Sequence, residues 1–218
     1  MKANMNSHEK RVVMQRRMTQ KERSTATKRK FLDAAARVLV EAGYANLTTT
    51  RVCREAGMSQ GALFKHFPTK TSLISGLAED LYKSLADEYE ALFKAEEKKT
   101  DLIRKSIRNL WTVFSSQRQM ASYDLTMAAR TDPELRSVME DAVRKHRERI
   151  EAIAEKIRIR LGMEKPLFNP LADLILMAVQ GGAVNTLAFP DPEATEKRLN
   201  YLEDLAGKAA GLSRKGPL

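Results

Sequence analysis

Apolar residues recur at intervals of three and four along most of the chain, which is the spacing of side chains on one face of an α-helix. In the segment 24–43, Phe31, Ala35 and Val38 follow this spacing, and Gly43 is placed to end the helix. No segment shows the alternation of apolar and polar residues typical of a half-buried β-strand. The pattern therefore predicts an all-α protein of about nine helices.

The other helices are predicted from the same spacing and from residues that begin or end a helix. Gly57 separates two short helices, and Asp132 followed by Pro133 marks the start of the longest one. Pro166 and Pro170 are expected to bracket a loop. The expected helical ranges are 24–42, 49–55, 60–67, 71–94, 103–114, 120–130, 133–161, 171–189 and 193–211.

Composition excludes several classes of protein. Of the 218 residues, 43% are hydrophobic, which is enough to bury a core, and both glycine (10) and proline (7) are scarce. The single cysteine, Cys53, excludes an intrachain disulfide and a cysteine-based zinc site. It is expected to be an inert core residue, with a redox-sensing thiol as the alternative. The three histidines are scattered, and neither a phosphate-binding glycine loop nor a nucleophile elbow is present. We therefore expect no metal, no cofactor, no catalytic residues and no enzyme.

The sequence carries no sign of a membrane or secretory protein. The longest apolar run near the C-terminal half is 174–179, far short of the ~20 residues that cross a bilayer. The first 24 residues are basic but lack the apolar stretch of a signal peptide. We expect a cytoplasmic protein that does not contact a membrane.

The net charge of +10 is concentrated at one end of the chain. Residues 1–70 hold 15 Lys and Arg against 5 Asp and Glu, whereas residues 71–218 hold 23 of each. A basic segment beside a neutral body indicates a module that binds a polyanion. We predict a basic flexible arm over 1–23, a DNA-binding domain over 24–70 and a helical body over 71–218. The arm could reach into a minor groove or stay disordered.

Residues 48–67 have the proportions of a helix-turn-helix motif, with the turn at Gly57. The second helix of this motif enters the major groove of DNA, with its N-terminal residues at the base edges. Here those residues are Ser59, Gln60, Gly61 and Ala62. Hydroxyl and basic side chains around them are candidates for phosphate contacts. These candidates are Thr48, Thr49, Thr50, Lys65, His66 and Lys70.

The residues of this motif are more specific than its spacing. Residues 48–70 read TTTRVCREAGMSQGALFKHFPTK and resemble the DNA-binding domain of the TetR family of transcriptional regulators. The most diagnostic stretch runs from Gly61 to Lys70, and the detailed resemblance covers 24–75. The family often has a tyrosine at position 64 whose hydroxyl contacts phosphate, so Phe64 lacks that hydrogen bond. The resemblance implies an all-helical homodimer with a three-helix DNA-binding head and a larger body that dimerises and binds a ligand.

The body holds polar and polarisable side chains among apolar ones, which is typical of a ligand pocket but also of an ordinary core. His146, on the apolar face of the longest helix, is expected to be a core histidine unless it contacts a ligand. The charged run 144–149 is expected to be a solvated face. The candidate ligand residues are Trp111, Phe114, Met120, Tyr123, Asp124, Met127, Met139, His146, Phe168 and Gln180.

The last two helices are the predicted dimer interface. The segment 171–189 is apolar on most faces and needs more cover than a subunit of this size offers. Gly181, Gly182 and Ala183 permit close approach of a second helix. Together with 193–211, this segment could form a four-helix bundle with its symmetry mate, as the resemblance also implies.

Together with these patterns, the resemblance implies a dimeric repressor that binds a palindromic operator and is released by an unidentified small molecule. The helix 71–94 joins head to body and is the natural link between ligand and DNA. The alternative is a DNA-binding regulator without a small-molecule switch, controlled by a protein partner or by its abundance. A body filled by its own side chains would favour that alternative.

Overall fold

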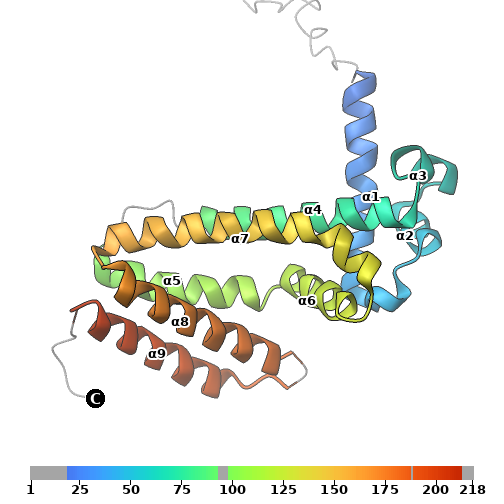
Figure 1. Ribbon diagram of the computed structural model, residues 1–218. Coiled ribbons are helices and arrows are strands. Elements are labelled where there is room, and N and C mark those ends of the chain that lie inside the picture. The colour runs from blue at the N-terminus through green and yellow to red at the C-terminus, as the bar shows by residue number, and fades with distance from the viewer. Residues whose placement is uncertain (1–18, 93–97, 188, 213–218) are drawn as a thin grey trace, which may run out of the picture.

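The computed structural model describes residues 19–92, 98–187 and 189–212, and these ranges contain nine α-helices and no β-strand (Figure 1). The all-α prediction is confirmed. A three-helix head, α1–α3, lies beside one end of a larger body, α4–α9. The helices are α1 (Gln20–Ala42), α2 (Thr49–Ala56), α3 (Gln60–His66), α4 (Lys70–Ala91), α5 (Lys99–Phe114), α6 (Gln117–Ala129), α7 (Pro133–Leu161), α8 (Lys165–Asn185) and α9 (Pro192–Ala209).

Helix α1 begins earlier than the apolar pattern predicts. Thr19 caps it, since its hydroxyl accepts a hydrogen bond from the backbone N–H of Glu22, and the Glu22 carboxylate accepts one from the N–H of Thr19. Residues 20–23, predicted to belong to a flexible arm, are therefore the first turn of a helix. The rest of the predicted arm, 1–18, lies outside the described residues.

The head is held together by one small apolar core. Phe31 and Leu39 of α1 are fully buried together with Val52 of α2 and Leu63 of α3. Gly57 adopts φ +63°, ψ +35°, a left-handed conformation that turns the chain between α2 and α3. The predicted helix-turn-helix geometry is therefore present.

Two long helices, α4 and α7, run side by side through the body, and α5, α8 and α9 pack below them (Figure 1). Helix α7 begins as predicted, because the Asp132 carboxylate accepts a hydrogen bond from the N–H of Leu135 at 2.9 Å. The expected loop between Pro166 and Pro170 is wrong. Both prolines lie in the first turns of α8, where Pro166 has no intrahelical N–H bond to lose and exposed Pro170 removes only one.

Helix α8 is also the one helix in the described part of the chain that is long and apolar enough to cross a membrane by length and composition, with a mean hydropathy of 1.4. It packs against α5 and α9 and carries Asp173 midway. Its outward side chains include Leu174 and Met177. That outer face is apolar, and it is considered below as a protein interface.

Candidate DNA-binding surface and ligand cavity

The N-terminal turn of α3 presents a shallow, open surface. Ser59, Gln60 and Gly61 are exposed, and Ala62 is half-buried. A Cβ atom on Gly61 would meet no atom within 4 Å. Leu63 on the opposite side of α3 is fully buried, so the helix is anchored by one face and free on the other. This places the four predicted base-contacting residues together on the outer surface of the head.

Gln60 is held by the preceding helix. Its side-chain Nε2 donates a hydrogen bond to Oγ1 of Thr50 at 3.0 Å. Thr48 caps the N-terminus of α2, because its hydroxyl accepts a hydrogen bond from the backbone N–H of Arg51. Thr50 is exposed and Thr49 is half-buried. The contact therefore orients a candidate base reader before DNA arrives.

The other candidate DNA contacts flank this surface. Phe64 is 41% exposed and Lys65 is exposed, so both side chains are accessible to the sugar-phosphate backbone of DNA. The His66 ring is half-buried and lies 6.4 Å from the ring of Phe31, centroid to centroid. Lys70, at the start of α4, has its Nζ 5.6 Å from the ring centroid of Tyr44. His66 therefore has a packing role as well as any contact with phosphate.

Cys53 lies on the inner face of α2. It is 5% exposed, and burial raises the pKa of its thiol. A protonated, buried thiol is a poor nucleophile. Within the described residues, no group of three or more His, Cys, Asp or Glu side chains is arranged to hold a metal ion.

The body contains a cavity of about 570 Å³ between α4, α5, α7 and α8. This size falls in the range of small-molecule binding sites. Side chains from α5, α7 and α8 form the wall, with the largest share from α8, and Tyr89 enters from α4. Its apolar lining comprises Ile103, Ile107, Leu110, Ile150, Ala154, Ile157, Leu161, Met163, Phe168, Leu171, Ala172, Ile175, Leu176 and Ala206.

Of the ten ligand candidates, only Phe168 lines this cavity. Met139 is buried in the core, and Met127 is 65% exposed. Asp124 is exposed, and burial raises the pKa of Tyr123 to about 12. The remaining candidates, Trp111, Phe114, Met120 and Gln180, are half-buried.

The cavity wall was missed because its residues belong to ordinary apolar helix faces. Ile103, Ile107 and Leu110 follow the same spacing as any core stripe on α5. Helical periodicity tells which face is turned inward, but it does not tell whether atoms from another helix fill the space opposite. A sequence signal for the cavity was therefore absent, and only the relative placement of four helices reveals it.

His146 lies in the interface between α7 and α4. Its Nδ1 is 3.0 Å from the backbone carbonyl oxygen of Tyr82, and the two rings are 5.3 Å apart. Burial lowers the pKa of His146, the contact with the Tyr82 carbonyl partly opposes this shift, and the charge of Arg149 adds a smaller lowering. A neutral imidazole that donates to the carbonyl fits this site. The residue packs as a core histidine away from the cavity.

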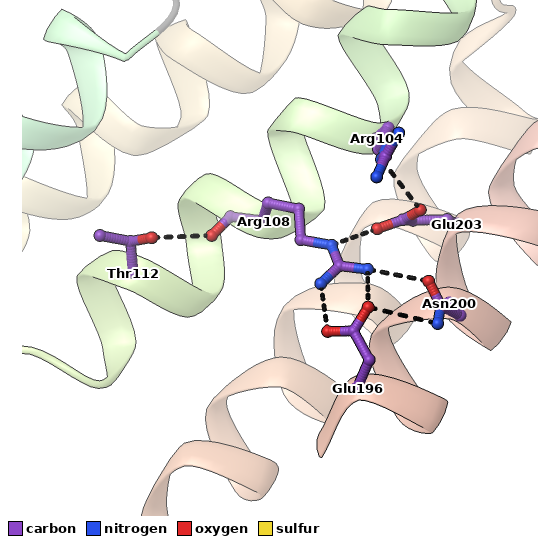
Figure 2. A network of polar contacts seen from close by, with 6 residues as sticks. All are labelled: Arg104, Arg108, Thr112, Glu196, Asn200 and Glu203. Carbon is purple, nitrogen blue, oxygen red and sulfur yellow. Dashed lines mark hydrogen bonds and ion pairs between the residues drawn. The ribbon is translucent and has the colours of Figure 1, made fainter. Parts of the chain in front are cut away.

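A polar network joins α5 to α9 (Figure 2). Its α5 residues, Arg104 and Arg108, do not line the cavity. Arg108 is at the centre of the network. Its Nε lies 2.5 Å from Oε1 of Glu203, and its Nη2 lies 2.8 Å from Oδ1 of Asn200. Arg104 adds a longer contact of 3.6 Å to Glu203. Because these contacts join two helices, they hold α9 against α5.

The outer faces of α8 and α9, and the loop that connects them, carry exposed apolar side chains. Most of the large ones in the described residues lie here rather than on the head or on α7. Such a patch on the surface of a folded domain indicates a protein interface. Its members are Leu167, Leu174, Met177, Val184, Leu187, Phe189 and Tyr201.

Comparison with known proteins agrees with this architecture. Residues 31–77 match the family described as bacterial regulatory proteins, tetR family, and residues 95–207 match the Tetracyclin repressor-like C-terminal domain. The HTH-type transcriptional regulator CymR of Pseudomonas putida is 31% identical over 191 residues, which cover 88% of this chain and 94% of that protein.

Solved structures share the fold. A transcriptional regulator from Rhodococcus sp. RHA1 superposes with a TM-score of 0.65 at 19% identity, covering 83% of this chain and 96% of the other. The multidrug binding protein EbrR, in complex with imidazole, superposes with a TM-score of 0.50 at 22% identity, covering 80% and 92%. The chain therefore belongs to the TetR family of DNA-binding transcriptional regulators.

Proposed function

We propose that this regulator is a cytoplasmic, dimeric repressor that binds a palindromic operator and leaves it when a small molecule enters the body cavity. The observation that carries the proposal is the course of α4. This helix begins at Lys70, directly after the helix-turn-helix, and brings Tyr89 near its other end into the cavity wall. Over 22 residues it spans about 33 Å. The single helix α4 therefore connects the DNA-binding head to the wall of the cavity.

Contacts in the first half of α4 connect it to both α7 and α1. The Thr71 hydroxyl lies 2.8 Å from a carboxylate oxygen of Glu134 on α7. The Arg29 guanidinium on α1 lies 2.5 Å from the carboxylate of Asp80. A ligand that favours one placement of α4 would therefore bias the position of the head, by as much as its affinities for the two states differ.

Dimerisation follows from family membership, and we assign it to α8 and α9. The apolar patch on these helices would be covered by the same patch of a second copy, as a twofold interface requires. Two heads related by a twofold axis would present two α3 helices to successive major grooves, about 34–36 Å apart. A palindromic operator matches that symmetry.

The cavity favours a ligand-released regulator over one controlled only by a protein partner or by abundance. EbrR, a neighbour in fold, is described as a multidrug binding protein. A cavity of about 570 Å³ in the body of this chain supports a small-molecule effector.

The proposal is tested by selecting the operator from random DNA and footprinting it with the full-length protein. We expect a protected palindrome and an affinity that falls steeply with salt. Gln60→Ala should cost about 1–3 kcal/mol on the operator and little on random DNA, because it removes a base contact. Lys65→Ala, the matched control, should weaken both DNAs alike. An asymmetric footprint, or equal effects of the two variants, would contradict the proposal.

A further inference from the structure

We infer that the body cavity takes an organic cation with a largely apolar body, such as an aryl-alkyl amine, in preference to an anion of the same shape. The inference rests on the proposed function, because it names the class of effector for the same cavity. Three features of the lining carry it: an apolar interior, a rim rich in carboxylates, and a lining lysine that already has a partner.

The interior offers surface for an apolar body. Ile103 and Ile107 of α5, Ile157 of α7 and Phe168 of α8 are each less than a tenth exposed and all line the cavity. An apolar ligand that fills this space would exchange water for hydrocarbon contacts. The body of the effector is therefore apolar.

The interior polar groups are neutral. Burial raises the pKa of Tyr89 well above its ordinary value, so its hydroxyl stays protonated. The Ser106 hydroxyl donates to the backbone carbonyl of Leu102 at 2.6 Å. Among the described residues that line the cavity, none is an arginine or a histidine. The interior thus supplies no positive charge to an anionic ligand.

The charged lining residues are Glu151, Glu155, Lys165 and Asp173. Lys165 is the single cation in this set, and its Nζ lies 3.7 Å from Oε1 of Glu155. Glu155 is also held by Arg158, at 2.8 Å. Glu151 and Asp173 have no hydrogen bond or ion pair with any other described residue. The negative charge of these two carboxylates is therefore available to a ligand.

These features discriminate by charge. A carboxylate ligand would lose its hydration on entering the cavity and would find no unpaired cation in the lining. It would also approach the two carboxylates of Glu151 and Asp173, which repel it. An ammonium group would meet Glu151 and Asp173 at the rim, and the faces of Phe168 and Tyr89 could stabilise it by cation–π attraction. The favourable charge on the effector is positive.

The test uses three ligands of one shape: phenylbutylamine, phenylbutanol and phenylbutyrate, which are cationic, neutral and anionic at neutral pH. Each is titrated into the full-length dimer by calorimetry, and operator release is followed separately by fluorescence anisotropy. We expect the amine to bind at least about tenfold more tightly than the carboxylate, with the alcohol between them.

Three variants locate the effect. Glu151→Gln with Asp173→Asn should weaken binding of the amine about five- to tenfold and leave the alcohol unchanged. Glu140→Gln, an exposed residue on α7 outside the cavity lining, is the matched control and should change neither. Ala154→Phe places a ring in the cavity and should weaken binding of the amine and the alcohol, with thermal melting reporting that the variant is folded.

Equal or tighter binding of the carboxylate overturns the inference, and so does the absence of binding by all three ligands. Binding of the amine that Ala154→Phe leaves unchanged also overturns it, because the site then lies elsewhere. The proposed function is read from the anisotropy. Release of DNA by the carboxylate alone would keep ligand control and reject the cationic class, whereas amine binding without release would keep the class and reject ligand control.

Discussion

Both terminal nitrogens of the Arg108 guanidinium on α5 donate hydrogen bonds to the carboxylate of Glu196 on α9, at 2.6 and 2.8 Å (Figure 2). The side chain of Glu203, on the Nε side of the same guanidinium, is only 10% exposed. The guanidinium lowers the pKa of Glu196. This pair connects a helix that lines the cavity to a helix of the proposed dimer interface.

Removal of that guanidinium should destabilise the body. Arg108→Met keeps the apolar stem but leaves the Glu203 carboxylate largely buried without its closest cation, at a cost of about 1–2 kcal/mol in unfolding free energy. Denaturant unfolding measures the change. Arg144→Met removes a guanidinium from exposed contacts with Asp141 and Glu148, and should leave the unfolding free energy nearly unchanged because solvent screens these charges. A similar loss in both variants would contradict a special role for Arg108.

His146 should make stability depend on pH. Its folded-state pKa lies below the ordinary value of 6.5, so the folded protein favours the neutral ring and the unfolded chain binds the proton more readily. The contribution is therefore fully present above pH 6.5 and is lost as the pH falls through the folded pKa. His146→Gln can still donate to the Tyr82 carbonyl but does not titrate. Melting temperatures between about pH 7 and pH 5 should fall less steeply in this variant. An unchanged slope would show that other groups dominate.

Two glycines of the head should respond oppositely to alanine. Gly57 has φ +63°, and a Cβ there costs about 1 kcal/mol although no atom lies within 4 Å of it. Gly61 is in regular helix, so Gly61→Ala should stabilise the head by about 0.5–1 kcal/mol. Its methyl group would nevertheless stand on the predicted DNA-facing surface and weaken operator binding. Thermal melts and operator affinities of both variants test this, and tight operator binding by Gly61→Ala would move the DNA contact away from α3.

The proposed dimer interface is tested by a charge on its apolar patch. Met177 of α8 is 54% exposed, and Met177→Glu should shift the dimer to monomer in sedimentation velocity and weaken operator binding. Ile159 of α7 is 62% exposed but lies outside α8 and α9, so Ile159→Glu is the control and should leave the dimer intact. Dissociation by the control alone would place the interface on α7.

The helices and the helix-turn-helix motif depend on residues that are close together in the sequence, so they could be predicted without coordinates. Apolar spacing predicts helices because burial of one face repeats every three to four residues, whatever covers that face. The turn at Gly57 and the motif from Gly61 to Lys70 are short-range features, and the head built on them belongs to the family that they indicated.

The tertiary structure decided the features that depend on what lies opposite a helix face. The pattern of α5 is the same whether Ile107 meets another side chain or a cavity, and the arrangement of α4, α5, α7 and α8 alone creates the space. The Arg108 contacts join residues about 90 positions apart, for which sequence spacing carries no signal. Long-range packing, which involves residues distant along the chain, therefore set the cavity and its link to α9, whereas local chemistry set the helices and the DNA-binding head.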